Sequence, residues 1–259
     1  VVIAATPMWA PVLRHLAADS RGFDAVDDWR ALPAVATAAD HVVAGYRAAA
    51  LADSATAVSG ELAEVLGRDF GLASLPIANG VDVDAFTGPV GERRARLPSE
   101  PFAIYLGVVQ QRVDFDLIAA ASSVMRVVVA GPAAPEFADA LHRSDVTWLG
   151  PVEPAEIPDL LRAAAVGLVP HRVDALTTSM DPMKVLEYLA AGLPVVATPV
   201  RIGARSDRIL VASGPAAFAE AVRAARDLAP LGHPDPAVDG YSWRAVADAL
   251  FDAHIAGRR

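Results

Sequence analysis

Short apolar runs alternate with amphipathic segments along the whole chain, and in the second half most of these runs stop at a glycine or a proline. Apolar runs of about four to eight residues bounded by turn residues are typical of buried strands, and a 3.6-residue apolar period is typical of helices. Because strands that alternate with helices favour parallel pairing, the pattern predicts an α/β protein with parallel sheets. Ligands of such sheets gather at the carboxyl ends of the strands.

Residues 81–101 interrupt this pattern. They contain several Asp, Gly and Pro residues and no sustained period, which indicates a break between two domains. We expect a first domain at 1–86, a second at 87–239 and a C-terminal helix at 240–259. The predicted strands are 1–6, 23–26, 55–59, 75–78, 102–106, 126–130, 146–149, 166–169, 194–198 and 209–212. The predicted helices are 33–50, 60–70, 114–122, 135–142, 156–165, 182–191, 215–225 and 242–255.

Composition excludes several classes of function. The 259 residues carry a net charge of −9, from 22 basic and 31 acidic side chains, and no basic run resembles a nucleic-acid footprint. A helix N-terminus could still bind an anion locally. The absence of cysteine excludes disulfides, thiolate metal sites and a thiol nucleophile, and it fits a cytoplasmic protein. No apolar run reaches the roughly 18 to 20 residues that a membrane span needs.

The segment 181–196 combines a helix with an unusual charge placement. Asp181 suits the N-cap, Pro182 the first helical position and Gly192 the residue after the helix. Lys184 then lies in the first turn, where the helix dipole disfavours a cation unless an anion joins it. A diphosphate there, with Glu187 one turn on to hold ribose hydroxyls, meets that requirement. The alternative is a surface pair of Lys184 and Glu187 worth about 0.2 to 0.5 kcal/mol.

Residues 183–198 closely resemble the donor-site motif of family 4 glycosyltransferases, the glycosyl transferases group 1. They are most similar to the subset that makes bacterial surface polysaccharides, including teichuronic-acid-type enzymes. The resemblance implies a GT-B fold, in which two Rossmann-like domains with parallel sheets face each other across a cleft. It implies that Glu187 binds the nucleotide ribose and that 87–239 bind the nucleotide sugar. It also implies an acceptor side at 1–86 and a helix at 240–259 that crosses back to the first domain.

Three further segments resemble the same family in the same order. Residues 76–86 resemble the segment that connects the two domains, although Asn-Gly alone favours a simple turn. Residues 105–114 resemble a strand and loop in which Gly107 and a downstream basic residue approach the diphosphate. Arg112 is the candidate because a guanidinium matches phosphate geometry, and a solvated loop arginine is the alternative. The resemblance places His171 at the end of the strand before the donor loop, directed into the cleft.

The first domain offers the candidates for the acceptor side. Residues 24–29 resemble the surface-polysaccharide subset, so Asp27 or Asp28 could line that side as catalytic residues, and a turn or helix cap is the alternative. Ser179 stands where the wider family has a glutamate that approaches the donor sugar. The family's glycine-rich acceptor loop is absent. The chain opens without Met in a strand already under way, so we expect about 100 residues to be missing upstream, a number based on usual domain sizes.

Two short acidic patterns raise the question of a metal. Residues 82–84 and 114–116 both read Asp-x-Asp, the pattern of metal-dependent glycosyltransferases with a different fold. Such a short pattern recurs by chance in an acid-rich chain, and no cluster of histidines and acids supports a magnesium or zinc site. We therefore interpret both patterns as incidental and expect neither a metal nor a cofactor.

The resemblance implies an enzyme of the hexosyltransferase type. It would move a sugar from a UDP- or GDP-linked donor to a carbohydrate or lipid-linked acceptor hydroxyl, with retention, in cell-surface polysaccharide or glycolipid synthesis. The expected location is the cytoplasm, including the inner face of the membrane. Two alternatives stay open. A GT-B UDP-sugar epimerase would share the nucleotide cleft but need no acceptor, and a non-catalytic module would only bind the nucleotide sugar.

Overall fold

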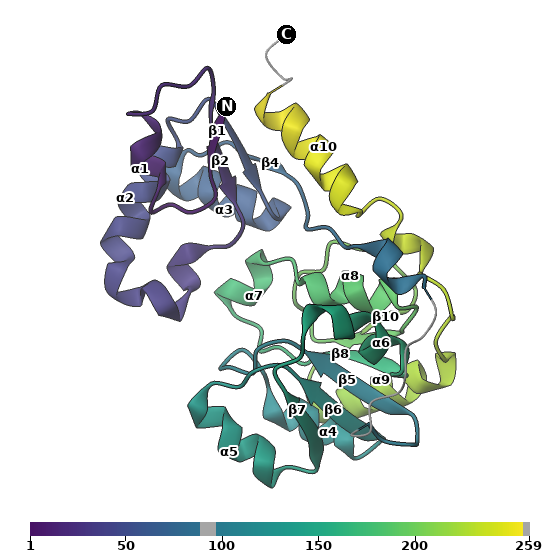
Figure 1. Ribbon diagram of the computed structural model, residues 1–259. Coiled ribbons are helices and arrows are strands. Elements are labelled where there is room, and N and C mark those ends of the chain that lie inside the picture. Colours follow the sequence, from purple (N-terminus) through teal and green to yellow (C-terminus); the bar gives the residue numbers. More distant parts are fainter. Residues whose placement is uncertain (89–96, 256–259) are drawn as a thin grey trace. The chain divides into compact units, whose positions relative to one another are not determined.

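The computed structural model describes residues 1–88 and 97–255, which form two compact units (Figure 1). Unit 1 consists of Val1–Gly80, Asp174–Asp181 and Trp243–Arg259, and unit 2 of Val81–Val173 and Pro182–Ser242. Each unit contains one parallel sheet with helices packed on it. None of the described helices combines the length and the apolar character that a membrane span requires.

Unit 2 is built on a six-stranded parallel sheet with the order β10-β9-β8-β5-β6-β7. The chain starts in the middle with β5, moves outward to β6 and β7, and then returns to the other side of β5. This order reverses between β5 and β8, and in open α/β sheets a ligand crevice forms at the carboxyl ends of the strands where the order reverses. The strands are β5 (Phe102–Leu106), β6 (Arg126–Ala130), β7 (Val146–Gly150), β8 (Val166–Val169), β9 (Val195–Ala197) and β10 (Ile209–Val211).

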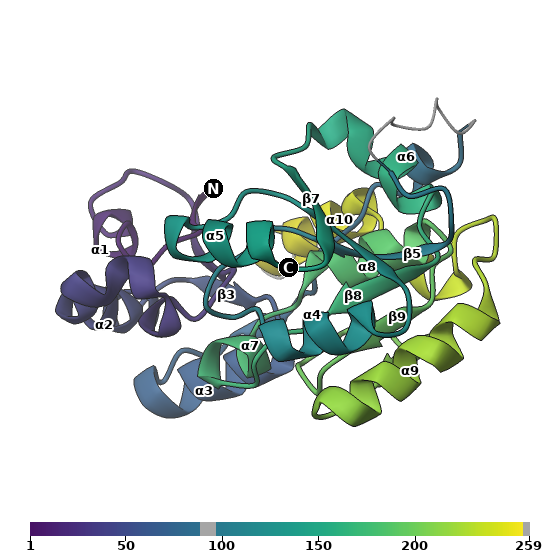
Figure 2. The same ribbon diagram turned by 90° about the horizontal axis from the view of Figure 1, so that it is seen from below.

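Helices cover both faces of this sheet because successive strand residues point to opposite sides. Phe102, Ile104 and Leu106 pack with α6 and α8, whereas Ala103 and Tyr105 pack with α4 and α9. Figure 2 shows α4 and α9 side by side, in agreement with their contacts. The helices are α4 (Phe115–Ser122), α5 (Pro135–Arg143), α6 (Ile157–Arg162), α8 (Met183–Ala190) and α9 (Pro215–Leu228), with 3-10 turns at Val83–Phe86, Pro154–Glu156 and Pro236–Val238.

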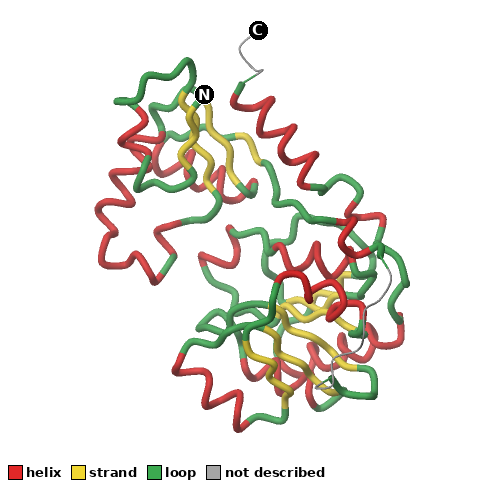
Figure 3. Tube along the Cα trace, viewed as in Figure 1, coloured by secondary structure: helices red, strands yellow, loops and turns green. Residues whose placement is uncertain are grey.

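Unit 1 has a four-stranded parallel sheet with the order β1-β2-β3-β4 (Figure 3). Phe23, Ala25 and Ala57 form its apolar face and pack against α1, α2 and α3. The strands are β1 (Val2–Ala4), β2 (Arg21–Ala25), β3 (Ser54–Ala57) and β4 (Leu75–Pro76). The helices are α1 (Ala10–Leu13), α2 (Ala39–Ala49), α3 (Gly60–Phe70), α7 (Ala175–Ser179) and α10 (Trp243–His254), with 3-10 turns at Trp29–Ala31 and Pro33–Ala38.

The opposite face of the unit 1 sheet is polar, and His254 of α10 covers it. Thr56 Oγ1 donates its single proton to Asp24 at 2.6 Å, so it accepts from Nε2–H of His254 at 3.0 Å. Nδ1 of His254 then accepts from the Ser54 hydroxyl at 2.8 Å. A side chain at Gly22 would collide with this imidazole. The network therefore fixes one tautomer of His254 and attaches α10 to the sheet.

Most predicted elements match observed ones within a few residues, but two predictions about helices need correction, and two short helices were not predicted. Ser59 caps α3, since its Oγ accepts from Leu62 N at 3.0 Å. Asp181 is not the N-cap of α8, because the cap is Pro182, and the Asp181 carboxylate accepts from Asn79 N instead. Helix 33–50 begins as a 3-10 turn at Pro33–Ala38, and the sequence pattern did not predict α7 or α1.

Candidate functional site

Three predicted site residues meet where the strand order of unit 2 reverses. Gly107 directly follows β5, His171 follows β8, and Lys184 lies in the first turn of α8. The Nζ atom of Lys184 lies 3.3 Å from Nε2 of His171 and 4.2 Å from the centroid of the Tyr105 ring. A cation over an aromatic face is attracted by the ring quadrupole, so Tyr105 holds the ammonium in place.

Glycines keep the strand ends next to Lys184 free of side chains. Gly107 has φ +129° and Gly131, at the end of β6, has φ +135°, a backbone conformation that other residues rarely adopt. A Cβ on Gly107 would lie 3.1 Å from Nζ of Lys184, and one on Gly131 would collide with the carbonyl oxygen of Gly107. The backbone at Gly107 therefore lies close to the ammonium, and Gly131 lets the backbone at the end of β6 lie close to Gly107.

The charge balance of this site favours an anion. Burial and, to a smaller extent, the nearby Arg112 guanidinium lower the pKa of Lys184 to about 7, against the opposing effect of Glu187. Burial also raises the pKa of Glu187, against the attraction of Lys184. Two cationic side chains thus share the site with one partly buried carboxyl. A bound diphosphate would restore the ordinary protonation of Lys184, because an opposite charge nearby favours the charged form.

His171 acts here as a neutral hydrogen-bonding group. Its pKa lies well below the ordinary 6.5, first because the ring is buried and then because Lys184 and Arg112 repel a further positive charge. Nε2 therefore accepts from the Lys184 ammonium, which leaves the proton on Nδ1. Nδ1 is buried and has no hydrogen-bond partner within the part of the chain that the structure describes. A buried N–H donor without a partner is costly, so this N–H is an unsatisfied donor of the site.

Tyr188 fixes α8 against the two central strands. Its hydroxyl accepts from Leu106 N at 2.8 Å and donates to Leu168 O at 3.3 Å, which joins β5 and β8. A side chain at Gly167 would collide with the Tyr188 ring. The sequence placed Tyr188 on the same helix face as Lys184 but gave no signal for this role. Lys184, one turn earlier, takes its position from this anchored helix.

Arg112 and Glu187 complete the predicted set in unit 2. The carbonyl oxygen of Arg112 accepts from Arg172 N at 2.7 Å, and Val113 pairs with His171 in an antiparallel bridge. The loop after β5 is therefore paired with the segment after β8, which explains why the Arg112 charge reaches both Lys184 and His171. Glu187 is half-buried one turn after Lys184 on α8. The structure thus brings together the five donor-site residues predicted from the sequence: Gly107, Arg112, His171, Lys184 and Glu187.

Asp27 and Asp28 belong to unit 1, and the structure gives Asp28 a capping role. Its carboxylate accepts from the backbone N and the Nε of Arg30 at 3.1 and 2.9 Å and pairs with the Arg30 guanidinium at 2.8 Å. Arg30 also pairs with Asp69. The carbonyl oxygen of Asp27 accepts from the Tyr46 hydroxyl at 3.0 Å. It stays a prediction that Asp27 or Asp28 lines the acceptor side.

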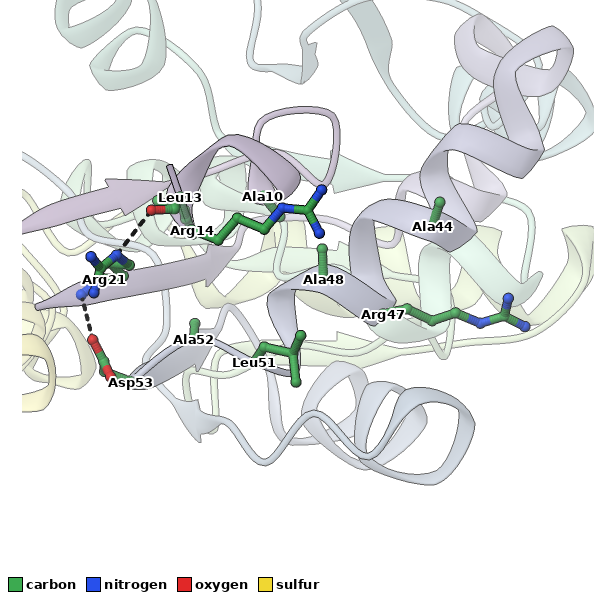
Figure 4. Close-up of a pocket in the computed structure, with 10 residues that line it drawn as sticks. All are labelled: Ala10, Leu13, Arg14, Arg21, Ala44, Arg47, Ala48, Leu51, Ala52 and Asp53. Atoms are coloured by element: carbon green, nitrogen blue, oxygen red, sulfur yellow. Dashed lines mark hydrogen bonds between the residues drawn. The ribbon is translucent and has the colours of Figure 1, made fainter. Parts of the chain in front are cut away.

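Unit 1 contains a separate hollow of about 560 Å³ (Figure 4). In Figure 4, Arg14 reaches across it toward α2, whereas Arg47 points away. Nε of Arg21 donates to Leu13 O at 3.0 Å, and Arg21 N donates to Asp53. Arg21 begins β2 and Asp53 precedes β3, so the hollow lies at the amino ends of these strands. Ligands of parallel α/β sheets gather at the carboxyl ends, so the hollow is a weaker candidate than the Lys184 site.

Acidic pairs do not gather into a metal site in the described part of the chain. No group of three or more His, Asp or Glu side chains that could hold a metal occurs there. Asp114 instead caps α4, since its Oδ1 accepts from Asp116 N at 3.0 Å. Asp82 is the N-cap residue of the 3-10 turn at Val83–Phe86.

Comparisons with known proteins give the family and the fold that the chain resembles. Residues 106–227, which include all five residues predicted for the donor site, match the family model described as glycosyl transferases group 1. A Bacillus subtilis protein named for teichuronic acid biosynthesis, the glycosyltransferase TuaH, is 27% identical over 132 residues, which cover 47% of this chain and 33% of that protein. The chain therefore spans about a third of the length of this curated relative.

Solved structures resemble the chain over nearly its whole length. Sucrose-phosphate synthase from Thermosynechococcus elongatus has a TM-score of 0.71 at 20% identity, covering 92% of this chain and 68% of that one. Anabaena HepE in complex with UDP has a TM-score of 0.61 at 15% identity, covering 90% of this chain and 71% of that one. At 20% and 15% sequence identity, these two structures show that the chain shares their fold and nothing further.

Proposed function

We propose that this chain, which has the GT-B fold and carries a glycosyl transferases group 1 domain at residues 106–227, is a glycosyltransferase that takes its sugar from a nucleoside-diphosphate donor. The observation that carries the proposal is the Lys184 ammonium. It is held over Tyr105 and beside His171, next to the glycine after β5, and its lowered pKa leaves it short of an anion. A donor diphosphate supplies that charge.

Each donor-site residue has a role that follows from its chemistry. As the bond from the sugar to the diphosphate breaks, negative charge develops on the leaving oxygen. Lys184 and Arg112 stabilise this charge from fixed positions, so little reorganisation is needed during the reaction. His171 accepts from the Lys184 ammonium through Nε2 and so helps to hold it in position. Glu187, one turn after Lys184, accepts from ribose hydroxyls and sets the position of the nucleotide along α8, which is a positioning role.

The finer features of the reaction rest on relatives and on the motif. The UDP-bound HepE neighbour supports a uridine nucleotide, with GDP as the other candidate. The name of the Bacillus relative supports an acceptor in cell-surface polysaccharide synthesis, either a carbohydrate or a lipid-linked sugar. A lipid-linked acceptor would require the enzyme to work at the inner face of the membrane. Transfer with retention and without a metal follows from the motif resemblance alone.

Calorimetric titration with UDP and with GDP tests the donor site. We expect one nucleotide to bind and Lys184→Met to weaken binding at least tenfold, because the variant removes a charge-assisted contact. Arg126→Met is the matched control, since Arg126 is an exposed cation at the amino end of β6. Equal affinities of wild type and Lys184→Met would contradict the proposed site.

A product assay separates transfer from the alternatives. The enzyme is incubated with the nucleotide sugar that binds, with and without a candidate acceptor, and both free nucleotide and sugar are followed. A transferase releases nucleotide only when the acceptor is present. An epimerase changes the sugar without an acceptor, and a binding module changes neither.

A further inference from the structure

Thr198 directly follows β9 at the carboxyl edge of the unit 2 sheet, and its side chain is buried there. Its backbone N donates to Val169 O at 3.1 Å, which continues the pairing of β8 with β9 by one residue. A β-branched side chain has few rotamers, so this fixed backbone also restricts the direction of the hydroxyl. The Thr198 hydroxyl is therefore a rigidly held group at the end of the sheet.

The Thr198 hydroxyl donates to the carbonyl oxygen of His171. The distance from Oγ1 to His171 O is 2.7 Å, and the bond is buried. Oγ1 also lies 3.4 Å from Val169 O, which already accepts from Thr198 N. A hydroxyl has one proton to donate, and the shorter contact has the better hydrogen-bond length, so His171 O is the main acceptor.

The carbonyl of His171 depends on this bond. His171 and Val113 form an antiparallel bridge, but the bridge leaves the His171 carbonyl out. Its hydrogen bonds join the residues on either side, namely Asp114 N to Pro170 O at 2.8 Å and Arg172 N to Arg112 O at 2.7 Å. Within the part of the chain that the structure describes, His171 O accepts from Thr198 alone. A buried carbonyl without a partner is costly, so the His171 backbone should move if the hydroxyl is removed.

The His171 ring meets its partners from this backbone. It packs edge-on against Tyr105, with ring centroids 6.2 Å apart, and its Nε2 lies 3.3 Å from Nζ of Lys184. Lys184 is held independently, because the two bonds of the Tyr188 hydroxyl fix α8. Thr198 therefore controls one member of the pair of Lys184 and His171 and leaves the other in place. All of these groups belong to unit 2.

We propose that Thr198 is a positioning residue for the nucleotide site. It acts through His171. The hydroxyl holds the His171 carbonyl and so keeps Nε2 where it accepts from the Lys184 ammonium. This inference rests on the proposed function, because it assigns Thr198 to the same donor site. Thr198 is the last residue of the segment 183–198 that resembles the donor-site motif, and the bond to His171 gives it a specific role.

Matched substitutions isolate the hydroxyl of Thr198. Thr198→Val keeps the shape of the side chain and removes the donor. Thr198→Ser and Thr198→Ala differ from each other by the hydroxyl alone, and this second pair carries the test if the valine variant does not fold. Val222→Ala is the stability control, because it opens a cavity in the buried face of α9, a helix that contains no residue of the donor site.

The measurements are UDP and GDP affinity by calorimetry across a range of pH, thermal stability, and imidazole nitrogen NMR of the free protein. One lost hydrogen bond changes an equilibrium constant by roughly threefold to tenfold. We expect Thr198→Val to weaken nucleotide binding by about that factor relative to wild type, and Thr198→Ala to do so relative to Thr198→Ser. Nε2 of His171 should lose the chemical shift of a hydrogen-bond acceptor in both variants.

The pH dependence of binding gives a readout that a loss of stability alone does not move. Without His171 as an acceptor, the charged form of Lys184 is less favoured, so the pKa of Lys184 should fall. The affinity for the nucleotide should then begin to drop at a lower pH in Thr198→Val than in wild type. Val222→Ala should lose stability and keep both the affinity and the pH profile.

Each outcome distinguishes the inference from the proposed function. If Lys184→Met weakens binding but Thr198→Val and Thr198→Ala keep the affinity and pH profile of their hydroxyl counterparts, the positioning role is wrong and the donor site stands. If Val222→Ala shifts affinity and pH profile as far at an equal loss of stability, Thr198 acts only through the stability of unit 2, and the inference is wrong. If the wild type binds neither nucleotide, the donor site itself is wrong and the inference falls with it.

Discussion

Nucleotide binding should draw a proton onto Lys184, and the amount can be worked out from its pKa. Burial holds the pKa of Lys184 at about 7 in the free protein, against an ordinary 10.5. A bound diphosphate should restore a value near the ordinary one. The free site is then half-charged near pH 7, so binding should take up roughly 0.1 proton at pH 6, roughly 0.5 at pH 7 and roughly 0.9 at pH 8. Above pH 7 the Kd should rise by up to about tenfold per pH unit.

Calorimetry in two buffers of different ionisation enthalpy measures this uptake directly. The nucleotide titrates on its own near neutral pH, so the quantity to compare is the difference between wild type and Lys184→Met at each pH. His171 adds nothing in this range, because its pKa lies far below the ordinary 6.5. Arg126→Met should behave like wild type. A difference of zero between wild type and Lys184→Met from pH 6 to 9 would refute the placement of the anion beside Lys184.

Three further outcomes follow from the geometry. Lys184→Met should raise the free energy of unfolding at pH 7 by roughly 1 to 3 kcal/mol in a denaturant titration, since the folded state lowers the pKa of Lys184 and so disfavours its charged form. Gly107→Ala should weaken nucleotide binding at least tenfold, because φ is +129° and the new Cβ crowds Nζ of Lys184. Gly150→Ala is the control: φ is +74° there too, but the space around Gly150 is open, so this variant should bind the nucleotide normally. Burial lowers the pKa of His254, so the unfolded chain binds a proton at this imidazole more readily than the folded chain does. Thermal stability should therefore fall as the pH drops below about 6.5, and His254→Gln should flatten this pH dependence.

The sheets could be predicted from the sequence because their signals are local. β5, β6 and β8 were predicted with the residue bounds that the structure has, since each is an apolar run that ends at a glycine or proline. The order of the strands in the sheet is not a local property. That the chain returns to pair β8 with β5 emerges only from the fold, and this return is what brings His171 next to Gly107.

The helix within residues Asp174–Asp181 could not be predicted for a related reason. Residues 175–179 are too few to show the apolar period that identifies a helix, and α7 begins with the capping box of Asp174 and Thr177. Asp181 has the composition of an N-cap, and the prediction failed because a distant residue, Asn79, donates to its carboxylate. The Tyr188 hydroxyl likewise contacts Leu106 N, which is far away in the sequence. Long-range partners decided each of these cases.

The polar face of the unit 1 sheet constrains the order in which the chain can mature on the ribosome. Asp24, Ser54 and Thr56 are synthesised before unit 2, yet the imidazole that satisfies them belongs to His254, which is synthesised after it. Until α10 has been synthesised, these polar groups depend on water for their hydrogen bonds. Unit 2 is synthesised between them and α10, so it can fold first. Domains generally fold as units during synthesis. Unit 1 is therefore the late step, and a nascent chain stopped before α10 should keep an open, protease-sensitive first unit beside a finished second one.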